Sequence, residues 1–231
     1  MRRPVTNHNQ AKRDAWVRRT LSEVPSGSRL LDVAAGFSRY RDACDHLVYE
    51  SHDSCQLPPD ITKYAEHTYV SDVCAIPALD SSYDVILCTE ALEHFPDPSA
   101  ALREMGRLCK PAGLLILTAP LGSGLHQEPY HFYGGFTPHW YHRFLEECGF
   151  VVETCQPAGG FFFKFAEDAL RAEVYLRKGI DCTRWARLLW PMYGPVLRWL
   201  IAPIMRAADR ASSETKFTVG YHVTVRKTSA K

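Results

Sequence analysis

The stretch from Arg29 to Tyr40 constrains the fold of this chain more than any other. It begins with an apolar run over 30–33 and continues into small residues at 34–36, which let the backbone turn sharply beside a ligand. This pattern predicts a buried strand followed by a tight turn. In a parallel sheet the ligand lies beyond the carboxyl end of such a strand, where we expect free backbone N–H groups to open the next helix.

Farther along, short apolar segments alternate with segments that suit helices. The one over 82–88 is almost wholly apolar, as is typical of a parallel strand buried on both faces. This alternation predicts a doubly wound, Rossmann-like α/β sheet of seven strands. We expect strands over 30–33, 47–50, 68–70, 82–88, 114–118, 150–154 and 216–227, and helices over 10–21, from a cap at Ser99 to 108, and over 137–148.

The length and charge of the chain limit the classes of protein to consider. At 231 residues we expect a single domain, 1–231, with one core around the sheet. Lysine plus arginine number 27 against 26 acidic residues, and a net charge of +1 gives no reason to expect a nucleic-acid partner. Eight cysteines without a Cys-x-x-Cys pair, and no apolar stretch after the N-terminal arginines, favour a cytoplasmic protein with reduced thiols.

An acidic residue follows the second expected strand at a spacing that has chemical meaning. Asp53 lies 17 positions beyond Gly36. In a βαβ unit an acid about 20 positions past the glycine turn reaches the tip of the second strand, where it can accept hydrogen bonds from both ribose hydroxyls of a nucleoside. Glu50 is the alternative for this role, and a solvated acid at a strand end is the plain structural explanation.

Five motifs in a fixed order make the chain resemble a known family. They are Leu-Asp-Val-Ala-Ala-Gly at 31–36, Asp53, Val-Ser-Asp-Val at 70–73, Ser-Tyr-Asp-Val-Ile-Leu-Cys-Thr-Glu-Ala-Leu-Glu-His at 82–94, and Leu-Arg-Glu-Met-Gly-Arg-Leu-Cys-Lys-Pro-Ala-Gly at 102–113. Over roughly 29–154 and the closing strand, the chain resembles the class I S-adenosylmethionine-dependent methyltransferases. The stretch 126–136 also resembles a branch associated with sugar, polysaccharide or natural-product pathways.

The resemblance implies a cofactor site made from the ends of several strands. S-adenosylmethionine carries a positive sulfonium and an ammonium, which are held best near carboxylates and carbonyls. Ala34 stands where the family usually has glycine, and alanine suits that position only if φ is negative. The residues that the resemblance assigns to the cofactor are Asp32, Ala34 and Gly36 for the methionine moiety, Asp53 for the ribose, Asp72 and Val73 for the adenine, and the backbone of Thr89 and Glu90 for the ammonium.

Three histidines are candidates for the chemical step. Methyl transfer is an in-line displacement, and an alkyl hydroxyl must lose its proton as it attacks, so a base with a near-neutral pKa is needed. His94 follows the fourth strand, and His126 and His131 lie in the long loop after the fifth. We favour His131 narrowly over His126; His94 alternatively packs the turn before Pro96. No strong metal motif accompanies these residues, so we expect no metal.

The segment 161–210, before the last strand, is the least standard part of the chain. Its part from 185 to 205 is strongly apolar, with arginines spaced through the segment, and the prolines argue against a membrane-spanning helix. We expect helices over the catalytic face, as a lid or a homodimer contact that covers the site, because so apolar a segment does not stay exposed to solvent. Peripheral contact with a membrane is the alternative, because tryptophan and arginine suit the headgroup level.

These observations predict a methyltransferase that acts on a small-molecule acceptor, most simply at a hydroxyl of a sugar or secondary metabolite. Two alternatives stay open. One is a non-catalytic module that binds S-adenosylmethionine, and the other is an N-methyltransferase that needs no general base. A nicotinamide-dependent oxidoreductase is disfavoured, because the three glycines of the dinucleotide pattern are absent.

Overall fold

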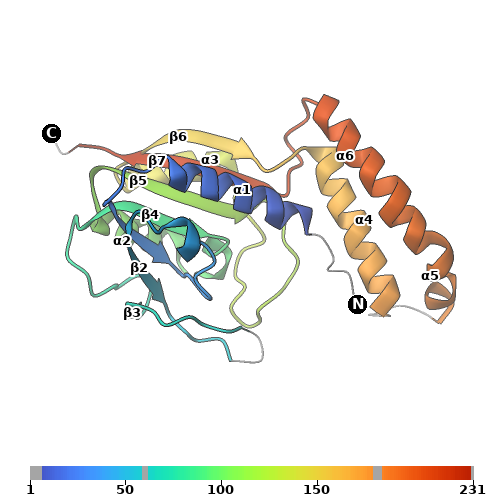
Figure 1. Cartoon of the computed structure of the whole chain (residues 1–231), viewed down its shortest axis with the longest axis horizontal. Helices are drawn as coiled ribbons and strands as arrows, with labels where there is room; N and C mark the ends of the chain where they lie inside the picture. Colours follow the sequence, from blue (N-terminus) through green and yellow to red (C-terminus); the bar gives the residue numbers. More distant parts are fainter. Residues whose placement is uncertain (1–6, 59–61, 179–183, 230–231) are drawn as a thin grey trace. The chain divides into compact units, whose positions relative to one another are not determined.

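The computed structural model describes residues 7–58, 62–178 and 184–229, so the basic residues 1–6 lie outside the described part. Seven strands form one sheet in the order β3-β2-β1-β4-β5-β7-β6 (Figure 1). Strands β1 to β5 are parallel, and β7 runs antiparallel to β5. The strands are β1 (Arg29–Val33), β2 (Val48–Asp53), β3 (Tyr69–Val70), β4 (Tyr83–Thr89), β5 (Cys109–Pro120), β6 (Phe150–Pro157) and β7 (Gly220–Lys227). The predicted Rossmann-like sheet is confirmed.

Alternating side chains along the strands fill a core on each face of the sheet. On one face, Leu30 and Leu87 pack with Trp16 and Leu21 of α1 (His8–Ser22). On the other face, helices α2 (Pro98–Leu108) and α3 (Pro138–Glu147) cover a larger core. That core includes Leu31, Ile86, Leu115, Met105 and Leu145. Neighbouring residues of one strand therefore serve opposite cores, which fixes the register of the sheet.

The first crossover differs from the prediction. We expected a helix to open at the turn after β1, but the chain forms only a short 3₁₀ helix, η1 (Arg41–Ala43). Ala34, Gly36 and Ser38 all have positive φ, at 54°, 56° and 55°, which is incompatible with a right-handed helix. No helix is found among the described residues between β2 and β3 either. The helical alternation therefore holds only from β4 onward.

Element boundaries differ from the prediction in two further places. The cap of α2 is Asp97 rather than Ser99, since the Asp97 carboxylate accepts a hydrogen bond from the Ala100 N–H at 2.9 Å and Pro98 takes the first helical position. Strand β5 begins at Cys109 and includes 111–113, whereas we expected this strand to begin at 114. A shift in its register against β4 accommodates that segment.

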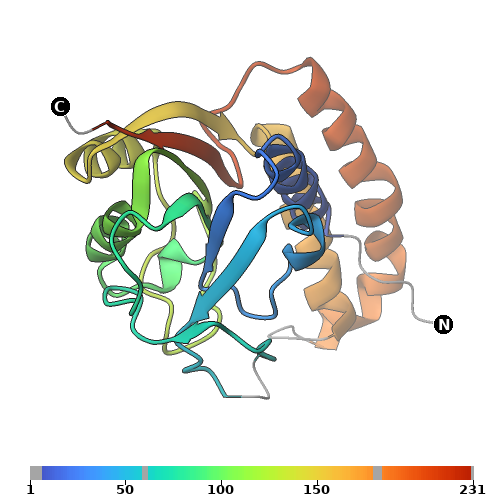
Figure 2. The ribbon, with the colours of Figure 1, turned by 60° about the vertical axis from the view of Figure 1, so that its left-hand side comes forward.

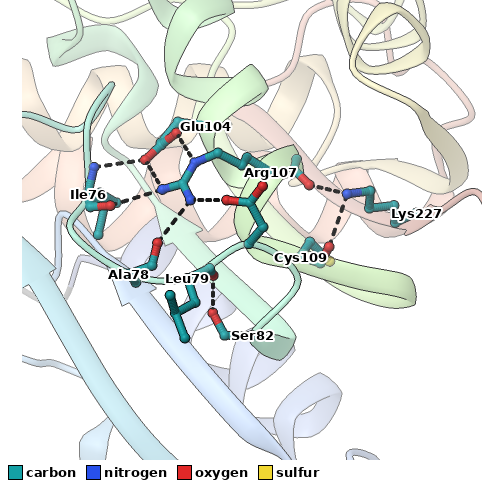
Figure 3. A network of polar contacts seen from close by, with 10 residues as sticks. Ile76, Ala78, Leu79, Ser82, Glu104, Arg107, Cys109 and Lys227 are labelled. Carbon is teal, nitrogen blue, oxygen red and sulfur yellow. Dashed lines mark hydrogen bonds and ion pairs between the residues drawn. The ribbon is translucent and has the colours of Figure 1, made fainter.

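An arginine network fixes the segment between β3 and β4 (Figure 3). The Arg107 guanidinium donates to both carboxylate oxygens of Glu104, at 2.7 and 2.8 Å, and to the carbonyls of Ile76 and Ala78, each at 2.9 Å. Glu104 in turn accepts from the Ile76 N–H at 2.8 Å. Helix α2 thus anchors the chain that follows the candidate adenine-binding pair, 72–73.

The chain divides into two compact units, residues 13–156 with 220–231, and residues 157–219 with 1–12. The second unit contains α4 (Phe161–Lys178), α5 (Arg184–Val196), the π-helix η3 (Leu197–Ile201) and α6 (Ala202–Ala211), as Figure 2 shows. Ala166 and Leu170 of α4 pack against Ala202 of α6. The segment is helical as expected, while its role as a lid, and the description of the chain as one domain, stay predictions.

Candidate active site

The turn after β1 forms one wall of the candidate site. Ala34 has a φ of 54°, so the negative φ under which alanine would suit this position is not found. The left-handed region costs a non-glycine residue about 1–2 kcal/mol. Gly36 has a φ of 56°, which glycine adopts without that cost. The turn therefore keeps the backbone shape that glycine would favour at both positions, although only one of them is glycine.

Asp53, the last residue of β2, holds this turn in place. Its carboxylate accepts hydrogen bonds from the backbone N–H of Gly36 and of Cys55, each at 2.9 Å, and the residue is buried. Each carboxylate oxygen has a second lone pair for another donor. Glu50 lies three residues earlier in β2 and pairs with Arg29 at 2.9 Å. The strand-end position thus belongs to Asp53, as its spacing suggested.

Asp32 in β1 is a second buried carboxyl at this edge. The Tyr49 hydroxyl donates a hydrogen bond to its Oδ2 at 2.9 Å. Burial raises the pKa of Asp32 to about 7; Asp53 also raises it, and the Tyr49 hydrogen bond acts in the opposite direction. A nearby positive charge would return this group to its ionised form, which suits a carboxyl beside a cationic ligand.

At the end of β4, Glu90 pairs with Arg13, a residue that the sequence did not single out. Glu90, at a φ of 50°, donates its backbone N–H to the Thr118 carbonyl, and its carboxylate forms an ion pair of 2.8 Å with Arg13 of α1. The Arg13 side chain is only 15 % exposed, and its Nε has no hydrogen-bond partner among the described residues. Arg13 reaches this edge because α1 packs on the sheet through Trp16, a tertiary contact that no local motif records.

The expected adenine-binding pair lies beyond the end of β3. Val73 is buried in the larger core, and Asp72 is exposed, with its carboxylate accepting a hydrogen bond from the Cys74 N–H at 2.8 Å. An apolar side chain and a polar one therefore flank the same turn. Their role toward an adenine stays a prediction.

The three candidate histidines form one cluster. The ring of His94, in the 3₁₀ helix η2 (Leu92–His94), lies 4.8 Å from the ring of His126 and 5.7 Å from that of His131, and the last two are 4.6 Å apart, centre to centre. The backbone N–H groups of Phe132 and Tyr133 donate to the Glu93 carbonyl, which ties the loop after β5 to the turn after β4. Residues 37 positions apart in sequence thus meet at one sheet edge.

Hydrogen bonds fix which nitrogen of each ring keeps a lone pair. The Nδ1 atoms of His94 and His126 face the carbonyls of Tyr130 and Gly124, which only accept, so Nδ1 carries the proton in both. Ser123 Oγ lies 3.0 Å from His131 Nε2 and 3.3 Å from the Gly134 carbonyl. We assign the serine proton to that carbonyl; His131 Nε2–H then donates to Ser123 Oγ, and the lone pair of His131 is on Nδ1.

Burial lowers the pKa of His94 and of His131, and the neighbouring histidines add to this effect because one imidazolium disfavours another. These two rings are therefore mainly neutral near pH 7 and able to accept a proton.

The aromatic residues of the loop after β5 divide between two roles: Phe136 is buried against Trp140 in the core, whereas Phe132 is half exposed.

Glu93 is the most buried polar group beside the cluster. It is 2 % exposed, its Oε2 has no hydrogen-bond partner among the described residues, and its Oε1 lies 4.0 Å from His94 Nε2. Burial, and then Glu90, raise the pKa of Glu93 to about 8. Ligand atoms of Glu93, His94 and His126 lie within 4.8 Å of one another, a donor set of a type that divalent ions accept. The expectation of no metal stays a prediction.

Comparison with known proteins identifies the domain. Residues 31–117 match the family model of the methyltransferase domain. The match covers less than half of the chain, so it shows that residues 31–117 are similar to this domain. The predicted resemblance to a methyltransferase is confirmed for these residues, and Asp32 in β1 and Asp53 at the end of β2 belong to the strands that the resemblance indicated.

Relatives of known name share this methyltransferase domain. A ubiquinone biosynthesis O-methyltransferase of Xanthomonas axonopodis pv. citri is 32 % identical over 105 residues, which are 41 % of this chain and 44 % of the relative. Its counterpart in Xanthomonas oryzae pv. oryzae is 33 % identical over 104 residues, 40 % and 43 % of the two chains. The chain thus spans less than half the length of these relatives.

Solved structures share the fold at low identity. The [4+2]-cyclase SpnF has a TM-score of 0.56 at 17 % identity, over 95 % of this chain and 82 % of its own. An S-adenosylmethionine-dependent methyltransferase of Mesorhizobium loti has a TM-score of 0.53 at 14 % identity, over 91 % and 96 %. At this identity the likeness shows the fold alone, and the fold occurs both in a cyclase and in methyltransferases.

Proposed function

We propose that the chain transfers a methyl group from S-adenosylmethionine to a hydroxyl of a small molecule, such as a sugar or a secondary metabolite. The observation that carries this proposal is the cluster of His94, His126 and His131 at the sheet edge that also holds Asp32 and Asp53. Hydroxyl acceptors need a base, whereas amines do not. The O-methyltransferase names of the Xanthomonas relatives support the same reaction class.

The residues at the ends of β1, β2 and β4 suit the parts of this cofactor. Asp53 would accept from the ribose hydroxyls through the lone pairs that Gly36 and Cys55 leave available. Asp32 and Glu90 would lie toward the positive ammonium and sulfonium, and Arg13 would hold the carboxylate of the methionine moiety. When bound, S-adenosylmethionine supplies an electrophilic methyl group on a positively charged sulfur. The position of the Arg13 guanidinium beside Glu90 supports its assignment.

His131 is the best candidate for the base. Its Nδ1 keeps the lone pair, and the hydrogen bond from Nε2–H to Ser123 Oγ holds the ring and stabilises the imidazolium that forms. His131 Nδ1 would take the hydroxyl proton as the acceptor oxygen attacks the methyl carbon. Methyl transfer of this kind depends mainly on alignment, so the base and the loop that carries it also position the acceptor.

Transfer of a labelled methyl group tests this proposal. The wild-type chain is incubated with methyl-labelled S-adenosylmethionine and matched acceptors that carry either a hydroxyl or an amine, and cofactor binding is measured by calorimetry. Label on hydroxyl acceptors supports the proposal. Label on amines alone indicates an N-methyltransferase, and binding without transfer indicates a non-catalytic module. The strained φ of Ala34 is the observation that keeps this last alternative in the test.

A further inference from the structure

The second unit exposes a continuous apolar stripe that the fold does not cover. Its residues recur every four positions along α5, η3 and α6, which together are called the α5–η3–α6 rod. Leu189 and Trp199 lie beside the stripe. Leu188 is 67 % exposed, Met192 70 % and Trp199 68 %. In the described chain these side chains lie at the surface. The stripe consists of Leu188, Met192, Val196, Leu200 and Ile204.

The π-helix keeps this stripe straight. In an α-helix a series with a spacing of four residues drifts by about 40° at each step, so five such residues would wind nearly halfway round. The Ala202 N–H donates to the Leu197 carbonyl, a wider turn that takes up one extra residue and reverses part of this drift. Pro203 follows at once, and it has no N–H for the Trp199 carbonyl. The wide turn therefore aligns the apolar residues of α5 with those of α6.

The charge of this rod differs from that of the rest of the chain. Residues 184–211 contain five arginines and one acid, Asp209, a net charge of +4; since the whole chain carries +1, all other residues together carry −3. Asp209 accepts hydrogen bonds from the backbone of Gly160 and Phe163, so its carboxylate caps α4. Arg210 is exposed, whereas Arg198 is committed to Glu173 at 2.5 Å.

We propose that the α5–η3–α6 rod lies flat on an anionic lipid bilayer, with the apolar stripe in the headgroup and acyl boundary. An interfacial helix combines an apolar face, tryptophan at headgroup depth and a net positive charge, and the rod has all three. No helix among the described residues is long and apolar enough to cross a bilayer, which agrees with a surface position. A second copy of the chain would carry the same +4 rod, so like charges would oppose a symmetric contact.

Flotation with lipid vesicles tests this proposal on the full chain. Vesicles of phosphatidylcholine with phosphatidylglycerol are compared with vesicles of phosphatidylcholine alone. The test variant is the double substitution Met192→Ser and Trp199→Ser, and the matched control is Leu79→Ser and Val151→Ser, two exposed apolar residues of the sheet unit. All four positions are exposed, so the variants should fold, and circular dichroism confirms this before binding is measured.

The wild type and the control should bind the anionic vesicles, and the test variant should bind about 10-fold or more weakly, because each buried side chain of this size contributes strongly to partition. Arg210→Gln should weaken binding about 5-fold, the effect of one basic residue at an anionic surface. Equal binding by the test variant and the control, or no binding by the wild type, would overturn the proposal. If the wild type and the control were dimers in solution and the test variant a monomer, the proposal would also be overturned, because the stripe would then be a subunit interface.

Discussion

The two halves of the candidate active site differ in how their polar groups are satisfied. At the ends of β1 and β2, Asp53 accepts from two backbone N–H groups and Asp32 accepts from Tyr49. At the ends of β4 and β5, Glu93 keeps a buried oxygen without a partner among the described residues, and each ring of the histidine cluster keeps a lone pair. The carboxylates of the first half are held by the chain itself and keep lone pairs for hydroxyl groups, whereas the second half keeps ring nitrogens that can take up a proton. Substitutions in the first half should therefore weaken cofactor binding, and substitutions in the second half should lower turnover.

The largest expected effect is on turnover, when the candidate base of the histidine cluster is replaced. His131→Ala should lower turnover about 10²- to 10⁴-fold while the dissociation constant of S-adenosylmethionine stays within a factor of about two, because a general base acts only in the chemical step. Calorimetry and labelled methyl transfer measure the two quantities. His142→Ala, an exposed histidine on α3, is the control and should change neither. If alanine at 94, 126 and 131 each left turnover nearly intact, base catalysis from this cluster would be wrong.

The second prediction concerns Asp53, where a substitution should change cofactor affinity. Asp53→Asn should weaken cofactor binding by about 1.5–3 kcal/mol, the range for hydrogen bonds to a charged group. Asparagine keeps one acceptor oxygen, so one of the N–H groups of Gly36 and Cys55 retains its hydrogen bond and the other loses it, and thermal unfolding checks that the variant is folded. Glu50→Gln is the matched control and should bind as the wild type does. Equal affinities for Asp53→Asn and the wild type would remove the ribose contact from Asp53.

A third effect concerns the buried carboxyl beside the histidines. The pKa of Glu93 is raised from 4.5 to about 8, so the folded chain binds the proton more tightly than the unfolded chain does. Its contribution to stability is present below pH about 4.5 and is lost as the pH rises through about 8. In Glu93→Gln, the free energy of unfolding should fall less between pH 5 and 8 than in the wild type, as measured by urea unfolding. Parallel curves for the two proteins would show that Glu93 titrates normally.

The smallest effect concerns the strained turn. Ala34→Gly should raise the free energy of unfolding by up to about 1 kcal/mol, because it relieves the positive φ while adding some freedom to the unfolded chain. Ala35→Gly, at a negative φ, is the control and should lower that free energy by about 0.5–1 kcal/mol. A loss of stability in both variants would mean that position 34 carries no strain. If Ala34→Gly also bound the cofactor more tightly, the strain at position 34 would affect cofactor affinity as well as stability.

How far the sequence could predict this site depends on whether local signals determine each part. The end of β2 follows from an apolar run and a spacing, so Asp53 was placed at the correct strand end. The loops after β4 and β5 must meet because those strands are neighbours, which accounts for the histidine cluster. Arg13 was missed because its position depends on the packing of α1.

The remaining differences between prediction and structure concern backbone conformation, which residue type alone does not determine. No residue preference predicts a positive φ at Ala34 and Ser38, and this conformation replaces the first crossover helix with η1. Helix α5 continues through Pro191 and Pro195, where we expected breaks. In the π-turn that follows, wider hydrogen bonds compensate for the bond that Pro203 cannot make.

The pH dependence of methyl transfer to a hydroxyl acceptor tests the central claim most directly. Turnover is measured between pH 5 and 8 for the wild type and for His131→Ala, at saturating cofactor. The base has a pKa below the ordinary 6.5, so wild-type turnover should fall about tenfold per pH unit on the acid side of that value, and His131→Ala should lose this fall together with most of its rate. A wild type that binds the cofactor but methylates no hydroxyl, or a pH profile that His131→Ala leaves unchanged, would contradict the account.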